Sequence, residues 1–324
     1  MRRSVTLVLA LVMALAVPLK ANAQPIASGR PINLFVGFAA GGPADLLARI
    51  VAERLQEQLG QPVVVQNRGG AGGTIAAATL AKTKPDGTNL MLVTSGHSGA
   101  PALYRALPFD NQKDFAPIVA LAQSPVVVLV DAKSPYRDIR ALVAAAKASP
   151  GKLNFGTGGG GATLTALAAV QLCRDVAIDA VAVNYPGSGP ANLALMSGTI
   201  DFGFDIVSGA MGLLSAGSVR GLAVTSPKRS SVLPDVPTVA ETVKPGFDIT
   251  GWFGILAPAG MEPELVARLN GELNRLLSVR ETRQRLAALG LDPIGGTPQQ
   301  FGDLIASETI RWGGLIRDLG LKAD

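Results

Sequence analysis

Apolar runs of strand length alternate with amphipathic stretches along most of the chain. The run Ile32 to Phe38 predicts a buried strand, and beyond two glycines apolar residues recur at helical spacing from Pro43 onward. Proline suits the first helical position because the amide there would have no partner in any case. The same order of strand, glycine-rich loop and helix returns at residues 63–82 and 153–172. This alternation predicts an α/β fold with largely parallel sheets.

The loop between the first strand and the first helix is a candidate anion site. Its glycines carry no Cβ, and the free amides of a helix start attract negative charge. Asp45 can reach back toward the cap and complement the positive end of the helix. A tight turn that binds nothing fits the same residues, so Gly37 to Asp45 leaves both interpretations open.

Two lobes are expected from the way the apolar runs are spaced. Apolar residues span 115–130 with a break at Ser124-Pro125, which we interpret as the passage from one lobe to the other. Residues 248–256 are extended and apolar, and we interpret them as the return crossing. Glycine loops of the two lobes can then face each other across a cleft. Amphipathic helices at residues 263–277, 282–289 and 298–319 are expected to cover the first lobe.

The first residues have the pattern of a signal peptide. Arg2 and Arg3 precede an apolar run from Val5 to Val17, and Ala21-Asn22-Ala23 follows as a small-x-small cleavage site. We therefore expect residues 1–23 to be removed and the mature chain to begin at Gln24, outside the cytoplasm. No later stretch is long and apolar enough to suggest a membrane helix.

Charge and cysteine content narrow the possible partners. The chain has 29 basic and 24 acidic residues, and loss of Arg2, Arg3 and Lys20 with the signal leaves 26 basic residues. This small excess contains no long basic block, so nucleic acid is not an expected partner. The single cysteine, Cys173, excludes an internal disulfide and is expected in the core of an apolar helix.

Enzyme chemistry is not expected from these residues. His97 is the only histidine and shares a predicted loop with Ser95 and Ser98, an awkward arrangement for a catalytic triad. One histidine and one cysteine cannot build a usual zinc site. The loop Gly156 to Gly161 lacks the Lys-Ser/Thr ending of a nucleotide-binding P-loop. We predict no catalytic residue, no metal and no cofactor.

Several short segments, in this order and spacing, carry a resemblance to a known family. They are Phe38-Ala39-Ala40-Gly41-Gly42-Pro43-Ala44-Asp45, Asn67-Arg68-Gly69-Gly70-Ala71-Gly72-Gly73, Lys84-Pro85-Asp86-Gly87-Thr88, Leu107-Pro108-Phe109-Asp110, Lys113-Asp114-Phe115-Ala116-Pro117, Tyr185-Pro186-Gly187, Ala223-Val224-Thr225-Ser226-Pro227-Lys228-Arg229, Leu233-Pro234-Asp235-Val236-Pro237-Thr238 and Phe253-Gly254-Ile255-Leu256-Ala257-Pro258-Ala259-Gly260. Over essentially the whole mature chain, the sequence resembles the Bug-type (TctC-like) periplasmic solute-binding receptors of tripartite tricarboxylate transporters.

The resemblance implies a two-lobed periplasmic binding protein of the type II-like class, with a ligand cleft between the lobes. Lobe 1 would comprise residues 24–124 plus 248–324, and lobe 2 residues 125–247. In the family the ligand's carboxylate is held mainly by backbone amides and small hydroxyls. The expected partners are a small organic acid or related solute and a two-subunit integral membrane permease, with the receptor itself a monomer in the periplasm.

Ligand contacts carried over by the resemblance come from both lobes. Arg68 and the glycines after it are expected to steady the site. The predicted ligand-binding residues are Phe38, Ala40, Gly41, Gly42, Asp45, Ser95, Gly96, His97, Thr157, Gly158, Gly160, Gly161, Ala162, Thr163, Tyr185 and Asp205.

Two departures from the family pattern bear on the ligand. The second-lobe loop is rich in glycine where relatives have serine and threonine, and Thr165 stands where relatives often have histidine. Pro186 replaces a common lysine, which removes a positive charge and makes a less anionic or partly apolar ligand plausible. Two alternatives to transport stay open at this stage, a solute sensor for a membrane kinase and a secreted hydrolase of small esters, and the lack of a separate histidine argues against the hydrolase.

Overall fold

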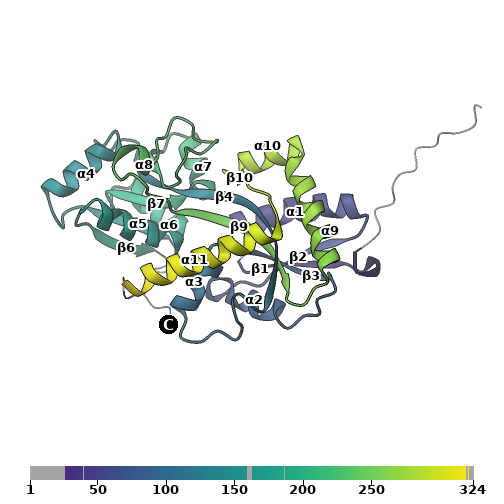
Figure 1. The fold of residues 1–324 in the computed structure, drawn as a ribbon. Helices are drawn as coiled ribbons and strands as arrows, with labels where there is room; N and C mark the ends of the chain where they lie inside the picture. The colour runs from purple at the N-terminus through teal and green to yellow at the C-terminus, as the bar shows by residue number, and fades with distance from the viewer. Residues whose placement is uncertain (1–25, 39, 159–162, 186, 319, 321–324) are drawn as a thin grey trace, which may run out of the picture.

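The ten strands of the described residues form one sheet that continues from one lobe of the protein into the other (Figure 1). The computed structural model describes residues 26–38, 40–158, 163–185, 187–318 and 320. Along the sheet the strand order is β2-β1-β3-β9-β4-β7-β5-β6, and β10 and β8 also pair with β4. The strands are β1 (Ile32–Val36), β2 (Val63–Asn67), β3 (Asn89–Thr94), β4 (Phe115–Asp131), β5 (Asn154–Gly158), β6 (Val181–Tyr185), β7 (Phe202–Ile206), β8 (Val219–Val224), β9 (Thr250–Pro258) and β10 (Asp292–Pro293).

Helices flank both halves of this sheet, which confirms the predicted two-lobed α/β architecture (Figure 1). We call the half around β1–β3 and β9 the first lobe and the half around β5–β8 the second lobe. Among the described residues, none of the helices is both long and apolar enough to cross a membrane. The α-helices are α1 (Pro43–Leu59), α2 (Thr74–Leu80), α3 (Gly96–Leu103), α4 (Ile139–Ala148), α5 (Leu164–Asp175), α6 (Ser188–Met196), α7 (Val207–Ser215), α8 (Val239–Thr242), α9 (Pro263–Ser278), α10 (Arg280–Ala288) and α11 (Pro298–Asp318), and short 3-10 turns occupy Ile26–Gly29 (η1) and Ala71–Gly73 (η2).

The sheet is mixed, with parallel pairs on the outside and antiparallel pairs at the crossing. β1 runs parallel to β2 and β3, and β5 runs parallel to β6 and β7. β4 and β9 pass between the lobes in opposite directions, so β9 is antiparallel to β3 and β4, and β4 is antiparallel to β7, β8 and β10. The antiparallel pairs therefore follow from a chain that crosses once in each direction.

The two apolar runs at residues 115–130 form a single strand, β4, instead of two separate ones. Up to the pair Pro125–Thr250 this strand pairs with β9, and from Val126 onward it pairs with β7 and β8. Proline has no N–H to donate and is tolerated in a strand only where a ladder bond is dispensable. Pro125 sits where the partner strands change, and the strand continues through it.

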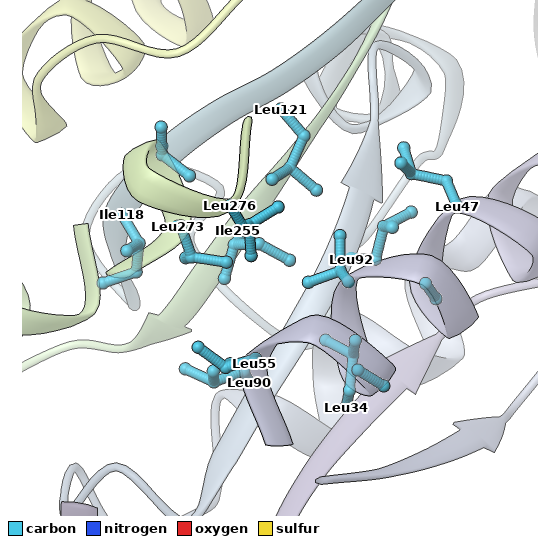
Figure 2. Packing of buried hydrophobic residues seen from close by; sticks show 14 of the residues in the cluster. Leu34, Leu47, Leu55, Leu90, Leu92, Ile118, Leu121, Ile255, Leu273 and Leu276 are labelled. Carbon is cyan, nitrogen blue, oxygen red and sulfur yellow. The ribbon is translucent and has the colours of Figure 1, made fainter. Parts of the chain in front are cut away.

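The first lobe has its largest core on the face covered by α1 and α9. Figure 2 shows Leu47 and Leu55 of α1 and Leu273 and Leu276 of α9 directed toward sheet residues such as Leu92. All these side chains are at most 1% exposed. The predicted amphipathic spacing from Pro43 onward thus corresponds to a buried helix face.

The C-terminal helix α11 covers both lobes, which corrects the expectation that it covers only the first. Phe301 and Ile305, near its start, belong to a first-lobe core that also contains Trp252. Trp312 and Ile316, two and three turns further on, belong to the main core of the second lobe. Helical spacing predicts a buried face but not which neighbour covers it, so no pattern in the sequence indicated this bridging role.

Candidate functional site

The candidate residues lie at the carboxyl ends of parallel strands in both lobes. In the first lobe they follow β1 and β3, and in the second lobe they lie at the ends of β5, β6 and β7. This edge of an open α/β sheet is where ligands bind, since loops and helix starts gather there. Of the predicted residues, Gly160, Gly161 and Ala162 lie outside the described part of the chain.

Asp45 is a buried carboxylate that fixes the loop before α1. It is 2% exposed, and its Oδ2 accepts hydrogen bonds from the Gly41 N–H and from Arg49 Nε, each at 2.9 Å. Its Oδ1 accepts from Asn67 Nδ2 at 2.9 Å. The Arg49 hydrogen bond lowers the pKa of Asp45 to about 2, assisted by the donors on Gly41 and Asn67. With both oxygens engaged, Asp45 acts as a positioning residue for the loop.

The same loop keeps other amides available at the start of α1. Gly41 has a left-handed backbone (φ +86°), and Gly42 is the N-cap with no side chain to cap the helix. The N–H groups of Ala44 and Asp45 receive no acceptor from the described residues, as expected for a first helical turn. Phe38 packs against the first-lobe core, while Ala40 and Gly41 are exposed. The first-turn amides carry partial positive charge, and the buried Asp45 carboxylate with its partner Arg49 lies at the same helix start.

The glycines of the second family-like segment allow two loops to touch. Residues 70–73 all have positive φ, including Ala71 at +45°, and lead into α2. A β-carbon built on Gly37, directly after β1, would lie 2.5 Å from the Gly73 Cα. The loop after β2 therefore rests on the loop after β1, which agrees with the expected supporting role of this segment.

Asp205 plays the corresponding part in the second lobe. It is 2% exposed at the end of β7 and accepts hydrogen bonds from Ser188 Oγ at 2.7 Å, Asn192 Nδ2 at 2.9 Å and the Ile206 N–H at 2.8 Å. Burial raises the pKa of Asp205 above its ordinary value, although these three donors oppose the shift. The carboxylate thereby ties the start of α6 to the end of β7.

The second-lobe loop between β5 and α5 is ordered at its two ends by hydroxyl groups. The Thr157 hydroxyl donates to Asn184 Oδ1 at 3.1 Å. The Gly158 carbonyl accepts from the hydroxyls of Thr163 and Thr165 at 3.2 and 3.4 Å, and Thr163 also caps α5 by accepting from the Ala166 N–H. The Thr163 and Thr165 hydroxyls bind the Gly158 carbonyl and the Thr157 hydroxyl binds the Asn184 side chain, so all three are engaged within the second lobe.

Two further contacts fix the ends of β5 and β6 against each other. A β-carbon on Gly158 would lie 2.4 Å from the Ser188 N, so this strand end abuts the loop after β6. The Tyr185 ring is half-buried and lies over Gly156, where a β-carbon would be 3.3 Å from Tyr185 Cε2. Glycine is thus required at residue 158, where the neighbour is backbone, and Gly156 leaves room for Tyr185 and for Ile200 Cδ1.

Ser95 lies at the junction of the first lobe with the returning strand β9. Its N–H donates to the Trp252 carbonyl at 2.9 Å, and the residue is 6% exposed. Its hydroxyl has no hydrogen-bond partner among the described residues. Gly96 begins α3, so the segment predicted as a loop is the first turn of a helix, which continues through Pro101.

His97 lies in an aromatic cluster inside the first lobe. Its ring stacks parallel to Phe109 and meets the edge of Phe115, with ring centroids 6.2 and 5.2 Å away. Its Nε2 lies 3.1 Å from the Asn111 carbonyl oxygen, and burial lowers its pKa to about 4. The imidazole is therefore neutral near pH 7 and is turned into the core, so the structure does not bring it to the strand-end surface as a ligand group.

The side chains that hold the two carboxylates were not predicted from the sequence. Asn67, Ser188 and Asn192 donate to Asp45 or Asp205, and none of them was among the expected site residues. Asn67 and Ser188 each stand beside a glycine-rich turn after a strand, which was the only available signal. Among the described residues, no group of three or more His, Cys, Asp or Glu side chains is placed to hold a metal.

Glycine-lined loops at the strand ends of two lobes, joined by a pair of crossing strands, define a two-lobed solute-binding receptor. The comparison with known families gives the particular class. The family described as "Tripartite tricarboxylate transporter family receptor" (TctC) matches residues 47–321, and the chain belongs to this family of periplasmic receptors.

Relatives and solved structures agree with this assignment. The chain is 35% identical to the protein BugT of Bordetella pertussis, over 95% of this chain and 94% of BugT. The chain is 32% identical in sequence to Rpa4515 from R. palustris, whose structure was solved with adipate. The two structures have a TM-score of 0.81, and the match covers 91% of this chain and 99% of Rpa4515. MatC from Rhodopseudomonas palustris with bound malate is 33% identical, with a TM-score of 0.74 over 89% of this chain and 99% of that one. These similar proteins are solute-binding receptors and not enzymes, in line with the prediction for this chain.

Proposed function

We propose that this receptor captures a small carboxylate-bearing solute, or a related amide, between its lobes and delivers it unaltered to a tripartite tricarboxylate-type permease. The observation that carries the proposal is the pair of strand-end loops held by Asp45 and Asp205. Each carboxylate engages donors within its own lobe, so other backbone amides remain available to a guest. Adipate and malate, named with two similar structures, belong to the same chemical class.

In this proposal the ligand is bound by backbone N–H groups in the first turn of α1 and by the side-chain hydroxyl of Ser95. The ligand residues comprise Gly42, Ala44 and the backbone of Asp45 in the first lobe, with Ser95 beside the crossing strands. Partial positive charge at the start of α1 attracts a carboxylate. Closure follows if the solute binds the closed form more tightly than the open one.

The lobe boundaries and the export route belong to the same proposal. We place lobe 1 at residues 24–124 plus 248–324 and lobe 2 at residues 125–247, supported by the change of β4 partners between Pro125 and Val126. Residues 1–23 are proposed to be cleaved on export to the periplasm, where the receptor works as a monomer and docks on a permease of two integral subunits.

A thermal-shift screen of the purified exported chain with organic acids and their amides tests the proposal. A solute at a hundredfold excess over its Kd adds about 2.7 kcal/mol to the free energy of unfolding. Gly42 has φ −80° and ψ 170°, a conformation open to any residue, so Gly42→Glu can fold while placing a carboxylate at the start of α1. We expect Gly42→Glu to bind the solute at least about tenfold more weakly than the neutral control Gly42→Gln. Equal binding by the two variants would show that the start of α1 is not part of the binding site. If no organic acid or amide in the screen raised the stability of the chain, the proposed receptor function would be wrong.

A further inference from the structure

Leu164 reaches from the second lobe to the crossing strand β9. It is the first residue of α5, and its side chain is half-buried. A β-carbon built on Gly251 of β9 would lie 2.6 Å from Leu164 Cδ2, closer than real β-carbons approach other atoms. The absence of a side chain at residue 251 is therefore what allows the leucine to touch this strand.

Groups from the first lobe and from both crossing strands surround the same point. The Gly251 β-carbon position lies 3.2 Å from the Ser124 carbonyl oxygen of β4 and 3.7 Å from Ser95 Oγ. Ser95 is only 6% exposed, and its hydroxyl has no partner among the described residues. Ser95 Oγ is not among the fully buried side-chain atoms that lack a partner, so this hydroxyl keeps some access to solvent and is placed to bind a guest or water. An apolar side chain of the second lobe thus lies beside an available polar group of the first.

We propose that Leu164 is a specificity-determining residue that limits the length of the solute. This inference rests on the proposed function, because it assigns a role within the same cleft. One end of the solute reaches the Ser95 hydroxyl, which donates to a carboxylate or amide oxygen. Leu164 occupies the adjoining volume, so a longer solute meets its methyl groups where the two lobes converge on β9.

The expected selectivity is moderate. An apolar wall discriminates by size alone, and each methylene accommodated or excluded changes the affinity only severalfold. Truncating Leu164 should therefore move the preference toward longer solutes without abolishing binding. If residue 164 instead made a hydrogen bond to the solute, truncating it would greatly weaken binding of every solute, because a buried polar group of the solute would lose its partner.

The test uses the straight-chain dicarboxylates from succinate to suberate as probes. Their Kd values are measured by calorimetry on the purified exported chain and on Leu164→Ala. We expect the ratio of succinate Kd to adipate Kd to rise about tenfold in Leu164→Ala. Leu193→Ala is the matched control, because Leu193 lies on α6 of the same lobe and is 65% exposed. It should leave the ratio unchanged.

Three other outcomes separate this inference from the proposed function. If Leu164→Ala weakens every diacid by one common factor, Leu164 has only a structural role and the inference is wrong, while the receptor function stands. If the chain and the variant bind none of the diacids, the inference is wrong, while the receptor function is decided by the screen of other organic acids and amides. If Leu164→Ala does not fold, Leu164→Val replaces it, and a ratio that stays constant in Leu164→Val contradicts the inference.

Discussion

The buried imidazole of His97 should make the stability of this receptor depend on pH in a window where few other groups titrate. It is the only histidine of the chain. Its ring lies against Phe109 and Phe115, and its Nε2 faces the Asn111 carbonyl. In His97→Phe the aromatic packing is largely kept, while the titratable group and its hydrogen bond are lost.

The size and sign of the effect follow from the shifted pKa. Burial lowers the pKa of His97 from 6.5 to about 4 in the folded chain. Between these values the unfolded chain binds a proton that the folded chain does not, so the free energy of unfolding falls as the pH drops. From about pH 7.5 to about pH 5 this amounts to ~2 kcal/mol, and it reaches ~3 kcal/mol below the folded pKa.

Urea denaturation of the chain and of His97→Phe at both pH values measures the difference. The carboxyl groups titrate alike in both proteins, so subtraction isolates the histidine. We expect the chain to lose ~2 kcal/mol more than His97→Phe on acidification, while at about pH 7.5 the variant is ~1 kcal/mol less stable because it lacks the hydrogen bond. If the free energies of unfolding of the chain and of His97→Phe changed equally with pH, the His97 imidazole would not be buried, and His97 would again be a candidate ligand residue.

Three further substitutions test the scaffold of the site. Asp45→Ala removes the acceptor of the Gly41 N–H and one of the two acceptors of Asn67 Nδ2, so it should lower the free energy of unfolding by ~2 kcal/mol in urea and weaken solute binding in calorimetry. Asp205→Ala should cost a similar ~2 kcal/mol, because it removes the acceptor of Ser188 and Asn192 in α6, and an unchanged urea midpoint would contradict the hydrogen bonds assigned to it. Gly37→Ala places a methyl group 2.5 Å from the Gly73 backbone and should lower the free energy of unfolding by ~2 kcal/mol. Gly271→Ala, in open space on α9, should raise the free energy of unfolding by ~0.5–1 kcal/mol. Thermal unfolding of the two variants measures both changes.

Local patterns in the sequence were sufficient to predict the strands and amphipathic helices. The run beginning at Ile32 and the helix from Pro43 appear in the structure because their signals, apolar period and proline at the first turn, are local. Helix α3 was missed because two glycines and Pro101 are typical of a loop, yet its buried face packs against α11, and Leu103 joins the main core of the second lobe. Packing against distant residues decided that segment, and such packing is not encoded in spacing.

The site could be predicted only as a set of strand ends. Asp45 and Asp205 were predicted as site residues. The sequence cannot show that their carboxylate oxygens accept hydrogen bonds from Asn67 and Asn192 within the protein. Likewise, His97 next to Ser95 suggested a shared surface. The helical turn that begins at Gly96 instead directs the imidazole into the core, while the serine hydroxyl stays at the lobe junction.

The two lobes fix the segments at their strand ends in the same way, with a close glycine contact and a buried carboxylate. In each, a glycine at or directly after the end of a strand presses on the backbone of a neighbouring segment, as Gly37 does on Gly73 and Gly158 on Ser188. A buried carboxylate then accepts hydrogen bonds from backbone and side-chain donors around it. Only Asp45 has a cation beside it, and its pKa is lowered, whereas the pKa of Asp205 is raised by burial. Because the described loop ends are held by contacts within their own lobe, we expect the amides to be in place before the solute arrives. A receptor built in this way loses little conformational entropy on binding, so its selectivity must come from the few side chains that enter the cleft.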